Sequence, residues 1–427
     1  MTNIKATHQF EDESIHEVDD EDLREEIESE QMKLELQTDL CKPVQLNSEQ
    51  IDFFIKRKGI KGIDANLIGR ISSSLNSGKH IILTGPPGTG KSKIAEAICI
   101  AAKQSSIIDD YKVITATSEW TTFETIGSYF PISTGNTNVK LEFSSGILLE
   151  SFSLKYINLE TRTNFWHIID EINRAQIDKA FGPFFTLFAK QKVLLPFRGK
   201  NLKQIEIIPA IPDNIDEIYE QLIEASNADL AFVESNMFII PEKWRLIGTM
   251  NCYDKDFLFK LSNAFLRRFS IIPVDIPIFE EYRKLIVEYI LIRNVDGVLN
   301  ESELKYLSNK IIRLLYSDRE LSSLQKVRKI GPAIIKDMIN YIFTSQSRFS
   351  VLNNKLEDTS NETEMRMNLL CVLLCDSILM FILPQFQDVD LNQVSSVYQD
   401  LLVEYDNDKL LFGYLKDNSM IVGEDLD

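Results

Sequence analysis

The feature that most constrains this chain is an eight-residue string between a short apolar run and a helical pattern. It reads Gly85, Pro86, Pro87, Gly88, Thr89, Gly90, Lys91 and Ser92, and it matches GxxxxGK[ST] at every fixed position. In such a loop, backbone N–H groups surround phosphates, the lysine meets the β and γ phosphates, and the hydroxyl reaches Mg²⁺. We therefore predict a nucleoside triphosphate site that works with Mg²⁺.

A second string supplies the carboxylates that such a site needs. The run from Phe165 to Ile169 is apolar and ends in Asp170 and Glu171. Asp170 is expected to hold Mg²⁺ together with Ser92, and Glu171 to polarise the attacking water as general base. A strand that ends in two acids is common by itself, but its place after the phosphate-binding string favours the catalytic interpretation.

Five apolar, β-rich runs alternate with helical patterns, which is typical of a parallel sheet covered on both faces. They are His80–Thr84, Lys112–Ala116, Phe165–Asp170, Trp244–Thr249 and Ser270–Val274. Helical periodicity dominates from about Phe279 to Leu383. The fold class is therefore α/β, followed by a helical region.

Three further strings carry a family resemblance. Asp170 to Ala175 reads DEINRA, Ile247 to Asp254 reads IGTMNCYD, and Leu261 to Phe269 reads LSNAFLRRF. Together with the phosphate-binding string they resemble the AAA+ branch that contains McrB-type restriction NTPases, MoxR-type chaperones and dynein. The resemblance implies an αβα sandwich with a parallel sheet and a small helical lid domain.

The resemblance also implies roles for individual residues. Asn251 is expected to orient the lytic water as a sensor 1 residue, since an amide both donates and accepts hydrogen bonds. Arg268 is expected to be an arginine finger that acts on the nucleotide of a neighbouring subunit, with Arg267 as the alternative. A finger that works in trans implies a ring of this chain, expected to be a hexamer.

Two insertions accompany the resemblance, and one residue of the lid differs from the family pattern. Residues 118–160 and 193–241 are expected to be insertions, the second with a hairpin. Five cations lie around the start of that hairpin, which predicts either a basic pore for nucleic acid or a solvated surface: Lys190, Lys192, Arg198, Lys200 and Lys203. In the lid, Ala333 stands where relatives often have a sensor 2 arginine, and Arg328 or Lys336 is a candidate substitute.

The distribution of charge along the chain indicates where its domains begin and end. The net charge of the chain is −18, and residues 1–40 carry fourteen acids against three bases. We expect residues 1–46 to be an acidic, largely disordered lead, residues 47–275 the nucleotide-binding domain, residues 276–385 the lid and residues 386–427 a short helical, acidic tail. Five cysteines without metal-ligand spacing indicate reduced thiols in a cytoplasmic protein, and no membrane span is expected.

The sequence leaves several functions open. The leading prediction is an NTP hydrolase, using ATP or GTP, that remodels or translocates a partner. Its preferred form is the motor subunit of a McrB-like DNA restriction system with a separate nuclease. A MoxR-like chaperone and a nucleotide-dependent assembly scaffold with slow hydrolysis are the alternatives.

Overall fold

A five-stranded parallel sheet forms the centre of the molecule. The computed structural model describes residues 20–133, 139–152, 164–199, 202–227, 237–252, 265, 267–317, 320–345 and 362–386. In the sheet the strand order is β10–β1–β9–β5–β2, and every neighbouring pair is parallel. The strands are β1 (His80–Gly85), β2 (Asp110–Thr115), β5 (Phe165–Asp170), β9 (Leu246–Asn251) and β10 (Phe269–Pro273). The five expected runs are confirmed as strands.

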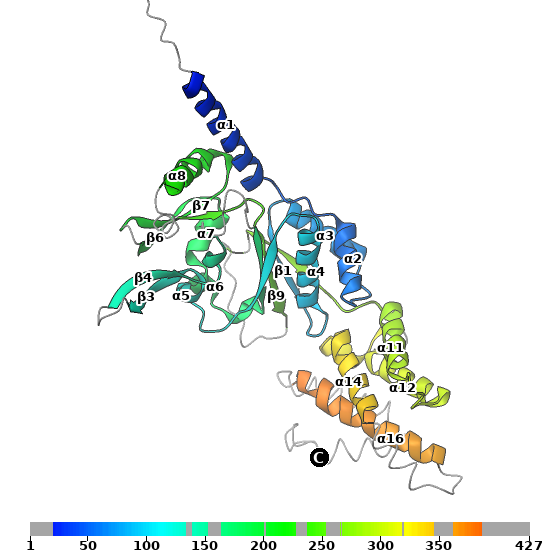
Figure 1. The fold of residues 1–427 in the computed structure, drawn as a ribbon. Helices are drawn as coiled ribbons and strands as arrows, with labels where there is room; N and C mark the ends of the chain where they lie inside the picture. The colour runs from blue at the N-terminus through cyan, green and yellow to red at the C-terminus, as the bar shows by residue number, and fades with distance from the viewer. Residues whose placement is uncertain are drawn as a thin grey trace, which may run out of the picture.

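Helices cover both faces of this sheet (Figure 1). In β1, Ile81 and Leu83 point to one face and Ile82 to the other, and all three are fully buried. Alternation between two buried faces explains why the three central residues of the strand are all apolar. One face is covered by α2 (Ser48–Arg57), α3 (Ala65–Asn76) and α4 (Lys91–Gln104), and the other by α6 (Ile177–Ala180) and α7 (Gly182–Phe188). The αβα sandwich is confirmed.

The two expected insertions contain smaller sheets. The first holds α5 (Thr122–Thr125) and an antiparallel hairpin of β3 (Gly127–Ser133) and β4 (Val139–Ser145). The second forms a three-stranded sheet from β6 (Val193–Arg198), β7 (Gln204–Pro209) and β8 (Met237–Ile240), with α8 (Ile215–Asn227) between β7 and β8. Strands β6 and β7 are antiparallel, so the expected hairpin is confirmed. Among the described residues, η1 (Leu149–Phe152) and η4 (Pro212–Asn214) are 3₁₀ turns of these insertions, and η3 (Ile172–Arg174) is a 3₁₀ turn directly after β5.

The N-terminal segment differs from its expected disorder. Residues Asp20–Leu40 form helix α1, which lies beside α8 (Figure 1). Leu36 and Leu40 are 0% and 2% exposed, in a cluster with apolar residues of α8, β7 and β8. The expectation of a largely disordered lead is wrong for residues 20–46, because two leucines one helical turn apart find an apolar partner surface on a distant insertion. Residues 1–19 and 387–427 lie outside the described residues.

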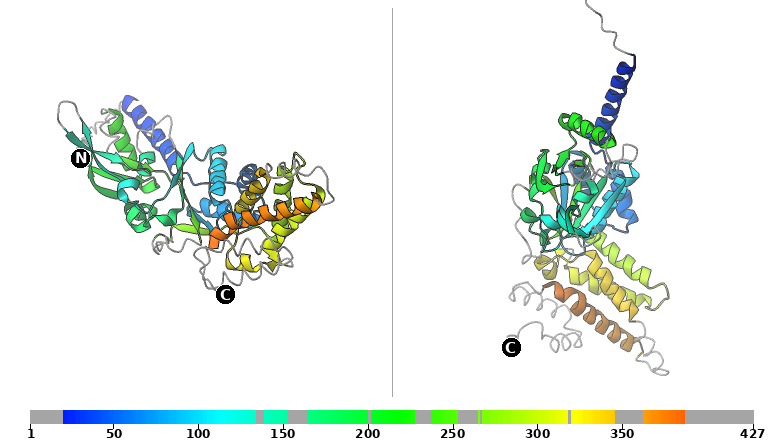
Figure 2. Two further views of the ribbon diagram at one scale, coloured as in Figure 1. Left: turned by 90° about the horizontal axis from the view of Figure 1, so that it is seen from below. Right: turned by 60° about the vertical axis from the view of Figure 1, so that its left-hand side comes forward.

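A helical lid follows the sheet (Figure 2). One buried apolar cluster joins its main helices. They are α11 (Phe279–Arg293), α12 (Glu301–Leu315), α13 (Ser323–Val327), α14 (Pro332–Thr344) and α16 (Glu362–Ser377), which continues as η6 (Ile378–Ile382) and η7 (Leu383–Phe386). A two-residue ladder of β11 (Tyr316–Ser317) and β12 (Glu320–Leu321) connects α12 to α13. Within the cluster, Arg366 binds the buried carboxylate of Glu303 with two nitrogens, at 2.7 and 3.0 Å.

The last lid helix is the most apolar segment. By length and composition, Met365–Phe386 is the one helix among the described residues that is long and apolar enough to cross a membrane. Just over half of its most apolar stretch is buried inside the protein. Leu370, Leu373 and Leu374 are fully buried in the lid cluster. Burial against α12 and α14 accounts for this apolar composition, since a core helix needs the same side chains. The five cysteines carry free thiols.

Candidate nucleotide-binding site

The glycine-rich loop links the carboxyl end of β1 to the first turn of α4. Gly88 and Gly90 have φ values of 76° and 85°, which side chains other than glycine rarely adopt. A Cβ at Gly85 would lie 2.1 Å from the carbonyl oxygen of Val274, so only glycine fits there. The loop therefore presents its backbone and the N-terminus of a 14-residue helix, the usual recognition element for phosphate groups.

The lysine of this loop is buried in place. Lys91 is 7% exposed, and its Nζ donates to the carbonyl oxygens of Gly85 at 3.0 Å and Pro86 at 2.7 Å. Thr89 Oγ1 also donates to the Pro86 carbonyl, at 3.0 Å. The ammonium is thus held within the curve of the loop, which is where a lysine must lie to meet a phosphate oxygen.

Oxygen ligands for a hard cation meet at the same edge of the sheet. Ser92 Oγ lies 2.6 Å from Asp170 Oδ1, and the Thr249 hydroxyl donates to that same carboxylate oxygen. Mg²⁺ takes oxygen ligands and keeps several waters, so a hydroxyl and a carboxylate beside a phosphate loop fit it. Within the described residues, no cluster of three or more His, Cys, Asp or Glu side chains forms an all-protein metal site. The predicted pair Ser92 and Asp170 is therefore brought together.

Glu171 follows β5 in a left-handed conformation, with φ 52°. Its backbone N–H donates to Thr249 Oγ1 at 3.1 Å, and its carboxylate pairs with Arg174 at 2.5 Å. Arg174 is the arginine of the DEINRA string. The arrangement places the predicted general base beside the metal ligands, and a guanidinium holds its carboxylate.

Asn251 lies next to the phosphate loop. It ends β9, and its Cα pairs with that of Gly85 in the parallel register of β1 and β9. The following amide, of Cys252, donates to the Gly85 carbonyl oxygen at 3.2 Å. This register puts the predicted sensor 1 residue at the carboxyl edge, beside the expected position of the phosphates.

The two arginines lie at the opposite edge of the sheet. Arg267 and Arg268 immediately precede β10, whose first residue pairs with His80 at the start of β1. Strands rise about 3.3 Å per residue, so this edge is about 16 Å from Gly85. Arg267 is exposed and Arg268 partly buried. Neither reaches the phosphate loop of its own chain, which agrees with a role in trans and leaves the choice between them open.

The lid contacts the phosphate loop through backbone. The N–H of Ala333 donates to the carbonyl oxygen of Gly88 at 3.0 Å. A Cβ at Gly331 would lie 2.3 Å from the carbonyl carbon of Gly88. The two candidate sensor 2 residues interact within the lid, since Arg328 donates to the Gln385 carbonyl and Lys336 lies over the Tyr289 ring. The contact between lid and loop shown here is therefore made by the backbone at the start of α14.

Sequence reasoning assigned no role to three residues at this site. They are Thr249, Arg174 and Gly331. A signal existed for Thr249, because it lies two residues before Asn251 and therefore on the same side of an otherwise apolar strand. Arg174 stands three residues after Glu171, a spacing that allows a side-chain pair. Nothing in the sequence pointed to the contact between Gly331 and Gly88.

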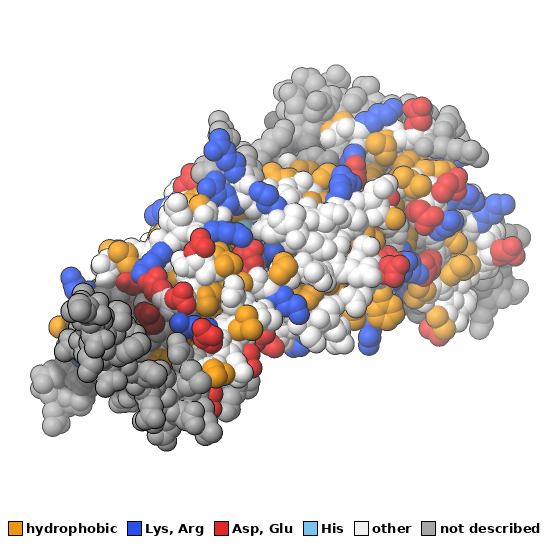
Figure 3. Space-filling view, turned by 90° about the horizontal axis from the view of Figure 1, so that it is seen from above, with side chains coloured by type: hydrophobic (Ala, Val, Ile, Leu, Met, Phe, Trp, Pro, Cys, Tyr) orange, Lys and Arg blue, Asp and Glu red, His pale blue; other side chains and the backbone are white. Residues whose placement is uncertain are grey.

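The cations around the β6–β7 hairpin are partly engaged. Lys190 pairs with Glu242 at 2.8 Å, and Lys192 pairs with Glu206 at 2.7 Å and also with Glu217. Lys200 lies outside the described residues. Figure 3 shows one face of the molecule, on which Lys and Arg lie among Asp, Glu and exposed hydrophobic side chains. Lys190 and Lys192 are therefore engaged in ion pairs and do not add to a continuous basic surface of the kind that nucleic acid requires.

The chain is similar to one known family over part of its length. No curated protein matches the chain. Among solved structures, the crystal structure of NtrX from Brucella abortus in complex with ADP matches with 11% identity and a TM-score of 0.35, over 76% of this chain and 55% of that one. The chain thus spans about half the length of that protein. Residues 80–269 match the family described as AAA domain (dynein-related subfamily), a range that includes every site residue predicted above, and this match supports an AAA+ ATPase.

Proposed function

We propose that this chain is a cytoplasmic ATPase that hydrolyses ATP with Mg²⁺ between the subunits of a ring. AAA+ proteins generally bind nucleotide and assemble in rings. One observation carries the proposal: Lys91, Ser92, Asp170, Glu171 and Asn251 meet at the carboxyl edge of three neighbouring strands. Bound Mg²⁺ would neutralise charge on the phosphates, held by Ser92 and Asp170. Glu171 is then the residue placed to accept a proton from water.

Two substitutions test the chemistry. Lys91→Ala should abolish ATP binding, because no other described cation is placed at the loop. Lys93→Ala is the matched control, since that exposed lysine lies two residues further along α4. Glu171→Gln should bind ATP and fail to hydrolyse it, because an amide cannot accept the proton. Turnover at the wild-type rate by the glutamine variant would exclude Glu171 as the general base. Parallel assays with GTP show which nucleotide is preferred.

The ring is tested by mixing variants. Arg268→Ala should bind ATP normally and lose about 10³–10⁵ in rate if the finger acts in trans. Mixed with Lys91→Ala, it should regain activity, since one variant supplies an intact loop and the other an intact finger. Arg267→Ala identifies the finger by comparison. Absence of rescue in mixed assemblies confirmed by mass photometry would argue against a shared site.

For the partner, we propose the motor of a McrB-like DNA restriction system that works with a separate nuclease. The support is the DEINRA string and a hairpin with Arg198 and Lys203 near its turn. Stimulation of ATP hydrolysis by duplex DNA, lost in Arg198→Gln, would support this. A MoxR-like chaperone remains the alternative, and stimulation by an unfolded protein but not by DNA would select it.

A second candidate function is a nucleotide-dependent assembly scaffold with slow hydrolysis. The ion pair between Glu171 and Arg174 favours it, because a carboxylate held by a guanidinium is oriented toward that partner and away from an attacking water. Steady-state turnover separates the two candidates. A scaffold assembles with ATP and turns over slowly, and Arg174→Ala should then accelerate hydrolysis.

A further inference from the structure

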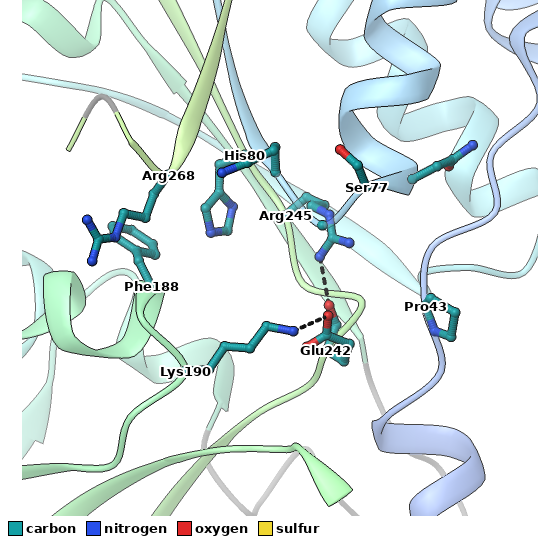
Figure 4. Close-up of a pocket in the computed structure, with 11 residues that line it drawn as sticks. Pro43, Ser77, His80, Phe188, Lys190, Glu242, Arg245 and Arg268 are labelled. Carbon is teal, nitrogen blue, oxygen red and sulfur yellow. Dashed lines mark hydrogen bonds and ion pairs between the residues drawn. The ribbon is translucent and has the colours of Figure 1, made fainter. Parts of the chain in front are cut away.

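A cavity of about 360 Å³ opens at the amino edge of the central sheet (Figure 4). The end of α3, the start of β1, the segment after α7 and the turn before β9 line it. The phosphate loop lies at the other end of β1, about 16 Å away at 3.3 Å per residue. Nucleotide held by the chain's own loop therefore does not fill this cavity. Its volume falls in the range of small-molecule sites.

One wall of the cavity is a buried histidine with a fixed tautomer. His80 is 8% exposed, and its Nδ1 accepts the backbone N–H of Leu246 at 3.0 Å. Burial, followed by Arg245 and Lys79, lowers the pKa of His80 well below 6.5, so the imidazole is neutral and its proton lies on Nε2. Among the described residues, no hydrogen-bond partner is found for that Nε2–H. Figure 4 shows the ring directed into the cavity.

Aromatic neighbours hold this donor in position. The ring of His80 lies 4.8 Å from that of Phe188, 4.9 Å from Trp244 and 5.2 Å from Phe269. A ring fixed on three sides loses little freedom when a ligand binds, so its donor is preorganised.

A buried guanidinium supplies further donors. Arg245 is 3% exposed, and its Nε donates to the Leu75 carbonyl at 3.0 Å. Its Nη1 donates to the carbonyl oxygens of Glu242 and Trp244, each at 2.7 Å. Burial lowers the pKa of Arg245 to about 10, which leaves it cationic near neutral pH. Within the described part of the chain, no partner is found for Nη2, and the residue lines the cavity.

The charge of the lining favours an anion. Four cations line the cavity with one carboxylate, that of Glu242, which pairs with Lys190 at 2.8 Å: Lys79, Lys190, Arg245 and Arg268. The Lys79 ammonium also donates to the Arg267 carbonyl at 2.8 Å. Four cations against one anion leave an excess of positive charge. Together with two donor groups fixed by packing, this excess attracts a ligand that has several acceptor oxygens.

We propose that this cavity binds the phosphate group of a small molecule, at a site separate from the nucleotide loop. A tetrahedral oxyanion offers acceptors in several directions, which suits an imidazole N–H and a guanidinium that approach from different walls. The argument rests on His80 and Arg245 and does not need Arg268. It also holds if the chain does not hydrolyse ATP.

Inorganic phosphate is the probe, and Lys91→Ala is the background, because that substitution removes the competing phosphate loop. Calorimetric titration should give one saturable site. In the same protein labelled with ¹⁵N-histidine, the Nε2 signal of His80 should shift on titration. The chain has only four histidines, so His80→Phe assigns the signal.

Three substitutions make the test directional. Lys190→Gln should weaken binding about tenfold, the usual value of one charge-assisted contact. Glu242→Gln should strengthen phosphate binding, because it removes the carboxylate that repels an anion. Damage to the fold would not increase the affinity, so a gain distinguishes the two. The control is Lys305→Gln, an exposed lysine of the lid, which should change nothing. No saturable binding up to about 10 mM phosphate, or equal affinity in all three variants, overturns the proposal.

The source of the phosphate is settled by the state of assembly. Binding to protein that mass photometry shows to be monomeric assigns the cavity to a free phosphorylated molecule. A His80 signal that moves only when Glu171→Gln protein assembles with ATP would mean that the cavity meets phosphates held by a second copy, and it would contradict a site for a small phosphorylated molecule. A signal that moves under neither condition refutes oxyanion binding.

Discussion

Replacing Gly331 by alanine should separate the lid from the phosphate loop. The added Cβ would lie 2.3 Å from the carbonyl carbon of Gly88 and 2.4 Å from the carbonyl oxygen of Pro87. Ordinary contact requires about 3.5–4.0 Å, so one backbone must move by about 1 Å or more. Gly331 has φ −79° and ψ 158°, which alanine adopts freely, so the substitution adds no backbone strain of its own.

The expected cost follows from these contacts. Two packed backbones cannot yield by rotating a side chain, so overpacking should cost about 1–3 kcal/mol in the free energy of unfolding. The movement should also weaken the hydrogen bond from the Ala333 N–H to the Gly88 carbonyl, which is 3.0 Å long. A bond of this kind contributes about 1 kcal/mol, part of the same total.

Urea unfolding of the variant and of the parent measures the cost. Hydrogen exchange at the Ala333 amide should become faster, which reports on the lid contact alone. Gly69→Ala is the matched control, because a Cβ there meets no atom within 4 Å and lies inside helix α3. A loss below about 0.5 kcal/mol with unchanged exchange would refute the contact between lid and loop.

Three further predictions concern stability. Leu36→Ala should lower the free energy of unfolding, measured in urea, by about 2–5 kcal/mol, because this fully buried side chain packs α1 against the domain. A change near zero would show that α1 is not packed there. Arg366→Met should cost about 3–5 kcal/mol because it leaves the 1%-exposed carboxylate of Glu303 unpaired, and Arg366→Met combined with Glu303→Gln should recover much of that loss. Burial lowers the pKa of His167 to about 3, so below pH 6.5 the unfolded chain binds a proton at this residue that the folded chain does not. His167 should therefore lower the free energy of unfolding by up to about 1.4 kcal/mol for each unit by which the pH is decreased. His167→Gln should flatten that slope in urea titrations between pH 7.5 and 5, and an unchanged slope would contradict the assignment.

The sequence by itself determined the parts of the protein that local rules govern. The string from Gly85 to Ser92 is contiguous, so its residue types specify both the loop and its phosphate chemistry. Apolar runs specified the five strands, of which β1, β5 and β9 are largely buried and β2 and β10 are partly exposed. Asp170 follows an apolar run directly, and the family resemblance placed Asn251 near the phosphates. Both residues end parallel strands, whose carboxyl ends meet at one edge of the sheet.

Only the tertiary structure decided the contacts between distant segments. Leu36 lies in an acidic helix with a weak apolar pattern, and its burial depends on a surface that α8, β7 and β8 create. Gly331 meets Gly88 because the lid folds back on the loop, and no sequence spacing encodes that approach. His80 reads as an ordinary first residue of a strand, and its ring becomes a fixed donor only where Leu246 and Arg245 arrive from β9 and the turn before it. The physical reason is the same in each case: a short-range pattern sets backbone conformation, whereas burial and side-chain pairing depend on which surfaces the completed fold brings together.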